Sequence, residues 1–234
     1  MACQLSILNK PFAILAVILA GSTAYAQTSQ SEKLSDDPTK IVTKLGFRYS
    51  DFATVFGSVA FGPVTKINVS VAEGEQWSLG GSYLFEFGIV NVAASRKTLS
   101  SGIAQTQYSV GTFVPLTALG FEPDGWLLFP AAGANYTEGT LASFEFDFGD
   151  ALPFDTASKG GYLGMLALRP MTNDWVLKTG FVASAGSNDY SGFSLGAGLT
   201  YNATSQDSFS VFGSYIDNSF GQRELAGISY SREF

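Results

Sequence analysis

The chain contains no histidine, and its only cysteine is Cys3. Enzymes that activate a serine nucleophile commonly rely on a histidine base, so the sequence argues against a hydrolase or acyltransferase of that kind. Without histidine or clustered cysteine, zinc has no ligand set either. We therefore expect no catalytic residue, no metal site and no cofactor.

A basic excess is also missing. The chain has 13 lysines and arginines against 20 aspartates and glutamates, which gives a net charge of −7. Proteins that bind nucleic acid neutralise its phosphates with a basic surface. Nucleic acid is therefore excluded as a partner.

Long apolar runs are absent after residue 26. The one apolar run, at residues 12–20, has about half of the ~20 residues that a membrane-spanning helix needs. It follows Lys10 and is followed by the small-residue pattern Ala24-Tyr25-Ala26. These features are typical of a secretory signal peptide, so we expect residues 1–26 to be cleaved after export.

Proline is scarce, with 8 residues, whereas phenylalanine, tyrosine and glycine number 20, 10 and 26. This mixture favours β-strands over helices. Residues 27–40 are polar and show no period, which predicts a flexible tail. From Ile41 to Phe234 the side chains alternate with the period of a β-strand. The alternation predicts twelve strands, at residues 41–49, 52–61, 65–73, 76–87, 89–97, 105–116, 126–137, 160–170, 174–184, 190–202, 207–216 and 224–234.

Each predicted strand has one apolar and one polar face. A soluble two-sheet sandwich alternates in the same way, but it does not require aromatic residues at strand ends. Transmembrane barrels place girdles of aromatic residues there. In this sequence the aromatic residues near predicted strand ends are Tyr49, Trp77, Trp126, Tyr136, Tyr162, Trp175, Tyr201 and Phe234. The pattern predicts an all-β, antiparallel, up-and-down transmembrane barrel, and a secreted sandwich remains an alternative.

The connections support the barrel. When they are assigned alternately to the two ends, the longest one, at residues 138–159, falls on the side opposite the chain termini. Long outer loops, short periplasmic turns and an even strand count are typical of outer-membrane barrels. Residues 142–149 alternate as well, but a strand there would make the count odd, so we interpret them as part of an outer loop. Ten strands remain an alternative count.

The export signal, the continuous alternation and the aromatic last residue together resemble a Gram-negative outer-membrane β-barrel protein. In that class the last strand, with apolar residues at alternate positions and a final Phe, is recognised by the barrel assembly machinery. Here Phe234, Tyr230, Ile228 and Ala226 match this pattern, whereas Arg232 departs from it. The resemblance implies an outer-membrane location, contact with membrane lipid and lipopolysaccharide, and a periplasmic tail at residues 27–40. We expect a monomer.

The polar phase of the strands should face the lumen. Its expected charges are Lys44, Arg48, Lys66, Lys97, Arg169 and Lys178 against Glu86 and Glu233. Lysine or arginine facing lipid at mid-depth costs about 2–4 kcal/mol, so these residues belong inside the barrel. A twelve-stranded barrel is wider than the eight-stranded barrels whose side chains fill the interior. The sequence therefore predicts a passive, porin-like channel with a basic lumen that favours small anions.

Two further interpretations stay open. The basic residues could pair with Glu86, Glu233 or the N-terminal tail and plug the barrel. The protein would then be a structural or surface-interaction barrel, whose outer loop at residues 138–159 contacts a partner. Glu145, Asp147, Asp150 and Asp155 in this loop could bind a hard cation such as calcium, but their spacing matches no known loop motif.

Overall fold

The computed structural model describes residues 33–74, 76–98, 104–138, 140–141, 152–153, 158–218 and 221–234. The predicted signal peptide lies outside the described residues. Twelve of the described strands form the barrel: β1 (Lys44–Tyr49), β2 (Ala53–Phe61), β3 (Thr65–Ala72), β4 (Gln76–Phe85), β5 (Gly88–Thr98), β6 (Ala104–Phe113), β7 (Leu127–Glu138), β10 (Ser158–Pro170), β11 (Trp175–Gly186), β12 (Ser191–Asn202), β13 (Asp207–Asn218) and β14 (Gly221–Glu233).

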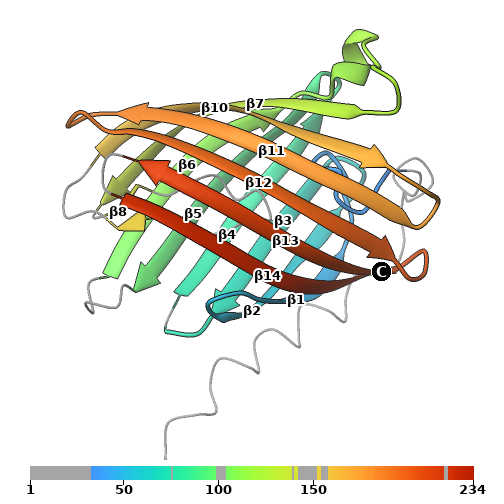
Figure 1. The fold of residues 1–234 in the computed structure, drawn as a ribbon, viewed down its shortest axis with the longest axis horizontal. Helices are drawn as coiled ribbons and strands as arrows, with labels where there is room; N and C mark the ends of the chain where they lie inside the picture. Colours follow the sequence, from blue (N-terminus) through green and yellow to red (C-terminus); the bar gives the residue numbers. More distant parts are fainter. Residues whose placement is uncertain are drawn as a thin grey trace, which may run out of the picture.

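The strands close into a single antiparallel barrel (Figure 1). Strand β1 pairs with β14, and the register joins Lys44 to Glu233 and Tyr49 to Ile228. The remaining pairs join strands that follow one another in the chain. Strand β7 pairs with β6 on one side and with β10, across the long connection, on the other. The twelve predicted strands are thus confirmed, and the alternative of ten is wrong. No helix of the described residues is long and apolar enough to cross a membrane.

The two ends of the barrel differ. The C-terminus and the short 3-10 helix η1 (Leu116–Leu119) lie at one end, and the two-stranded sheet of β8 (Thr140–Leu141) and β9 (Leu152–Pro153) lies at the other (Figure 1). Because both termini of outer-membrane barrels lie in the periplasm, we take the first as the periplasmic end. Residues 142–149, which the sequence indicates to be part of an outer loop, lie outside the described residues.

The outer face of the barrel is apolar. Its exposed side chains include Phe47, Leu79, Val110, Phe181 and Ile228, each on the phase that the sequence predicts to be apolar. Large apolar areas on this scale are stable only when another apolar medium covers them. A closed barrel with such an exterior fits a lipid bilayer, whereas a sandwich would bury this face.

Aromatic residues ring the periplasmic end on this outer face. The rings of Trp175 and Tyr201 lie 4.9 Å apart, and those of Phe209 and Tyr230 lie 5.0 Å apart. Tyr162 is an exception, because it points into the barrel and is only 8 % exposed. Its ring occupies the space beside Gly133, where any side chain would collide with it. The prediction that Tyr162 belongs to an interfacial girdle is therefore corrected.

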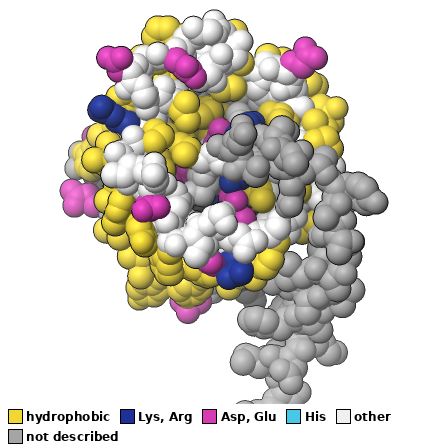
Figure 2. Space-filling model, turned by 90° about the vertical axis from the view of Figure 1, so that its right-hand side faces the viewer, with side chains coloured by type: hydrophobic (Ala, Val, Ile, Leu, Met, Phe, Trp, Pro, Cys, Tyr) yellow, Lys and Arg dark blue, Asp and Glu magenta, His cyan; other side chains and the backbone are white. Residues whose placement is uncertain are grey.

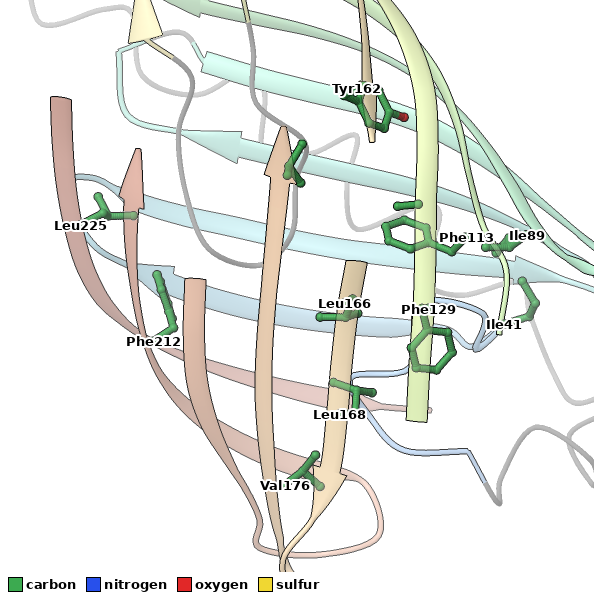
Figure 3. Packing of buried hydrophobic residues seen from close by; sticks show 12 residues of the cluster. Ile41, Ile89, Phe113, Phe129, Tyr162, Leu166, Leu168, Val176, Phe212 and Leu225 are labelled. Atoms are coloured by element: carbon green, nitrogen blue, oxygen red, sulfur yellow. The ribbon is translucent and has the colours of Figure 1, made fainter. Parts of the chain in front are cut away.

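The interior of the barrel is apolar on one side. Figure 3 shows these buried side chains pointing inward from several strands, with Leu168 at 0 % exposure. The whole cluster comprises Ile41, Ile89, Phe113, Phe129, Ala131, Tyr162, Leu166, Leu168, Val176, Val182, Phe212 and Leu225. The polar phase of the strands predicts a polar lumen and does not indicate this cluster. Close packing here gives the barrel an internal core in addition to its lipid-facing surface.

Candidate functional site: the lumen

The polar side of the lumen is built by β3, β4, β5 and β6, whose inward positions carry hydroxyl and amide groups. The Asn68 side-chain amide donates a hydrogen bond of 3.1 Å to the Ser82 hydroxyl. The hydroxyls of Ser70 and Ser78 lie 2.6 Å apart across the neighbouring strands. Such groups can exchange hydrogen bonds with water or a polar solute at little cost. This wall therefore suits a hydrated passage.

A cavity of about 360 Å³ lies against this wall. Phe113, Tyr162, Leu166 and Leu168 line it from the apolar side, and residues 35–38 of the chain line it from the periplasmic side. The volume falls within the range of sites that hold small molecules, about 300–1,000 Å³. The lumen is therefore hollow on the side of residues 35–38 that faces away from the periplasm.

Lys44 and Arg48 line the cavity from β1. The Arg48 guanidinium lies 5.2 Å from the ring centre of Phe56 and 5.9 Å from that of Phe212. The Lys44 ammonium lies 5.8 Å from the Phe56 ring centre. A Cβ at Gly46 would collide with the Phe56 ring, so glycine makes room for it. The aromatic faces favour both cations and hold them toward the cavity.

The N-terminal segment, residues 33–43, lies inside the periplasmic end of the barrel. Asp36 forms an ion pair of 3.1 Å with Lys178, and Lys40 forms one of 2.7 Å with Glu233. The Lys66 ammonium donates a hydrogen bond of 2.7 Å to the carbonyl oxygen of Lys40. Residues 33–40 were predicted to be a flexible tail in the periplasm, and this placement corrects that prediction for the described part. Residues 27–32 lie outside the described residues.

Burial of the segment is nearly complete at its C-terminal half. Thr39, Lys40 and Ile41 are all buried, and Leu34 packs against the apolar cluster. Figure 2 is a view onto the periplasmic end. It shows charged side chains of both signs near the centre of the barrel and hydrophobic side chains around them. Because Thr39, Lys40 and Ile41 are buried inside the barrel, the segment narrows the lumen at this end.

Partial burial lowers the pKa of Lys33, whereas the negative charge of Asp37 acts to raise it.

The Lys178 side chain depends on a glycine of the adjacent strand. A Cβ at Gly198 would lie 2.8 Å from the Lys178 Cε and 2.9 Å from the backbone oxygen of Val211. Both distances are shorter than side-chain carbons tolerate. Gly198 thus provides the space through which Lys178, which is itself buried, reaches Asp36.

The structure does not bring all of the predicted lumen residues together. Lys44, Arg48, Lys66 and Lys178 line the cavity. Glu86 is exposed in the turn between β4 and β5. The side chain of Lys97 lies outside the described part of the structure.

Arg169 was predicted to face the lumen, and the register of β10 corrects this. Leu166 and Leu168 occupy the inward phase of β10, so Arg169 faces outward, where its guanidinium lies 5.5 Å from the ring centre of Trp126. The stretch from Met165 to Leu168 is apolar at every position. Because both faces are apolar there, alternation could not indicate which one points inward.

The predicted assembly signal lies on the last strand and beyond it. Ile228 is exposed on the outer face, and Tyr230 donates a hydrogen bond of 2.7 Å to the Asp207 carboxylate. Arg232 forms an ion pair of 3.1 Å with the same carboxylate. The Phe234 backbone N–H donates to the carbonyl oxygen of Thr43 at 2.9 Å, so the final residue is joined to the start of the barrel. Recognition of this strand by the assembly machinery stays a prediction.

Comparison with solved structures places this arrangement among known barrels. The NanC porin superposes with a TM-score of 0.52 at 10 % identity, covering 82 % of this chain and 98 % of its own. The KdgM porin in complex with disordered oligogalacturonate superposes with a TM-score of 0.52 at 10 % identity, covering 83 % of this chain and 99 % of its own. The translocator domain of autotransporter NalP from Neisseria meningitidis superposes with a TM-score of 0.53 at 13 % identity, covering 82 % of this chain and 85 % of its own. The chain has the fold of an outer-membrane β-barrel.

No protein-family model matches the chain, and no curated protein matches it by sequence. The fold and the apolar exterior together assign the protein to the outer membrane of a Gram-negative bacterium. The contents of the lumen must therefore supply the argument for its function.

Proposed function

We propose that the protein is a passive channel for small solutes, with a preference for anions. The observation that carries the proposal is the cavity inside the closed barrel, with a polar wall on one side and the cations Lys44 and Arg48 beside it. A rigid, hydrated lumen lets solutes exchange with water without a large conformational change. Fixed cations in such a narrow space raise the local concentration of anions.

The charge of the cavity wall supports the anion preference. Among the described residues, the charged ones on barrel strands that line the cavity and lie on the inward phase are Lys44, Arg48, Lys66 and Lys178, whereas Arg96 pairs with the outward-facing Trp77. The acidic residues lining it, Asp36 and Asp37, both belong to the N-terminal segment. The barrel itself therefore presents a basic wall inside a protein whose net charge is −7.

The structural neighbours agree with a channel but do not select it. NanC and KdgM are porins, and KdgM was seen with oligogalacturonate, whereas the NalP domain is a translocator. The same architecture thus serves different functions, as many folds do. The alternative, a surface-contact barrel, depends on residues 138–159. Of these the structure describes only the two ends and the short sheet of β8 and β9. Glu145, Asp147, Asp150 and Asp155 of this loop lie outside the described residues.

Replacing both Lys44 and Arg48 by Glu tests the anion preference. We expect planar bilayers containing the mature protein to show anion-selective current steps, and the double variant to pass cations more readily than chloride. The physical reason is that the reversal replaces two cations near the cavity by two anions. The measurement is the reversal potential across a potassium chloride gradient.

Lys159→Glu is the control for one such charge reversal outside the cavity, because Lys159 is exposed at the outer end of β10 and does not line the cavity. It should leave the reversal potential unchanged. A cation preference in the unmodified protein, or equal selectivity in the double variant, would contradict the proposal.

A further inference from the structure

We propose that the N-terminal segment is a displaceable gate, whose docked position closes the periplasmic end of the lumen and whose release both opens the channel and increases its anion selectivity. The inference rests on the proposed channel function, since a gate requires a passage. It concerns the regulation of that passage, and four features of the described residues support it.

The first feature is that the segment is docked without being part of the sheet. None of residues 33–43 belongs to a strand. Two short-range backbone hydrogen bonds form turns within residues 33–40, from the Asp37 N–H to the Leu34 oxygen and from the Lys40 N–H to the Asp37 oxygen, both at 3.1 Å. Closure of the barrel by β1 and β14 does not involve these groups. The segment can therefore leave without breaking a ladder hydrogen bond.

The second feature is a fixed point immediately after the segment's buried part. The Val42 carbonyl oxygen accepts a hydrogen bond of 2.7 Å from the Ser58 hydroxyl. Thr43 accepts two hydrogen bonds. Its carbonyl oxygen accepts one of 2.9 Å from the Phe234 N–H, and its hydroxyl accepts one of 3.1 Å from the Ala60 N–H. These bonds hold residues 42–43 on the barrel wall. The movable part thus ends at Ile41.

The third feature is the way in which side chains hold the docked segment. The contacts include the Asp36–Lys178 and Lys40–Glu233 ion pairs, a hydrogen bond of 3.0 Å from the Ser35 hydroxyl to the Asn202 side chain, and the hydrogen bond from Lys66 to the Lys40 carbonyl. Ile41 is also buried, and Leu34 packs against the apolar cluster. When a buried ion pair separates into water, both ions regain their hydration, which offsets much of the lost attraction. Docking by such contacts suits a part that moves and returns.

The fourth feature links opening to selectivity. Asp36 and Asp37 are the acidic residues that line the cavity in the described structure, and both leave with the segment. Release also separates Asp36 from Lys178, and the carbonyl of Lys40 from Lys66. Lys33 and Lys40 leave as well, but neither they nor Glu233, the partner of Lys40, line the cavity. The wall that remains around the cavity is basic. The released state is therefore both wider and more selective for anions than the docked state.

Deletion of residues 33–40 from the mature chain gives the direct test. The shortened protein joins residue 32 to Ile41 and keeps every strand. In planar bilayers we expect it to conduct severalfold more than the full chain and to show a reversal potential shifted further toward that of chloride. A second variant with residues 33–40 replaced by glycine and serine should behave in the same way, which controls for chain length.

Each outcome of this test decides a different point. Conductance and selectivity equal to those of the full chain would overturn the gate while leaving the channel in place. Silence of the full chain and of both variants, with barrel formation shown by heat-modifiable gel mobility, would overturn the channel function and the gate together.

A charge exchange tests the docking contact without shortening the chain. Asp36→Lys and Lys178→Asp should each replace the ion pair by like charges and raise conductance. The double variant Asp36→Lys/Lys178→Asp restores opposite charges and should return conductance to that of the full chain. Singles that conduct like the full chain, or a double variant that conducts like the singles, would overturn the role of this pair in gating.

Discussion

Val110→Arg should destabilise the barrel by about 2–4 kcal/mol, because it places a guanidinium on the lipid-facing side near the middle of β6. Val110 is 47 % exposed on the outer face. Its cross-strand neighbours are Val92 on β5 and Ala134 on β7, so no acidic partner is at hand on either side. Unfolding in urea from lipid vesicles, followed by the fluorescence of the three tryptophans, measures the loss.

The residue before Val110 offers a matched control. Ser109 points into the lumen and lines the cavity opposite Ala93 and Asn135. Ser109→Arg adds the same group one position away, where water and polar side chains surround it. We expect a change of less than about 1 kcal/mol in the free energy of unfolding. Equal losses for the two variants would contradict the assignment of the outer face to lipid.

Leu168→Ala should reduce the free energy of unfolding by about 2–5 kcal/mol, the usual cost of truncating a buried leucine. Leu168 is fully buried inside the barrel, within the cluster that also contains Phe129, Leu166 and Val176. If this side of the lumen were instead a hydrated wall, removing the side chain would cost little. The same urea titration from vesicles measures the effect.

Ser95→Ala is the corresponding change on the polar side of the cavity. Because Ser95 lines a cavity and is only partly buried, its replacement should change the free energy of unfolding by less than about 1 kcal/mol. A small effect at Leu168 would show that the apolar cluster does not act as a core. A large effect at Leu168 with a small one at Ser95 would establish the division of the lumen into two sides.

The strands and their outward faces could be predicted from the sequence because one physical constraint acts on every strand. Lipid on the outside forces apolar residues onto alternate positions, as Phe47, Leu79 and Ile228 show. The constraint acts on each strand separately, so it can be read without knowing which strands are neighbours. The count of twelve needed a second rule, the even strand number of outer-membrane barrels, because residues 142–149 alternate as well.

The inside of the barrel could not be predicted in this way. Inward positions can carry either polar or apolar groups, and the choice depends on what lies across the lumen. Before Arg169 the chain is apolar on both faces of the strand, so only the charge of Arg169 indicates a side, and it indicates the wrong one. At Asp36 and Lys40 the sequence shows a short polar stretch, and only the folded barrel reveals Lys178 and Glu233 as partners. These pairs join residues more than a hundred positions apart, which no local pattern records.

The ion pair between Lys40 and Glu233 also sets an order of events during assembly. The two residues are 193 positions apart, and Glu233 ends the last strand. The contact cannot exist until β14 has formed, because only then does its carboxylate stand beside the first strand. Pairing over so long a separation is entropically costly until the intervening chain is folded. We therefore expect the N-terminal residues to dock at the periplasmic end only after β14 has formed.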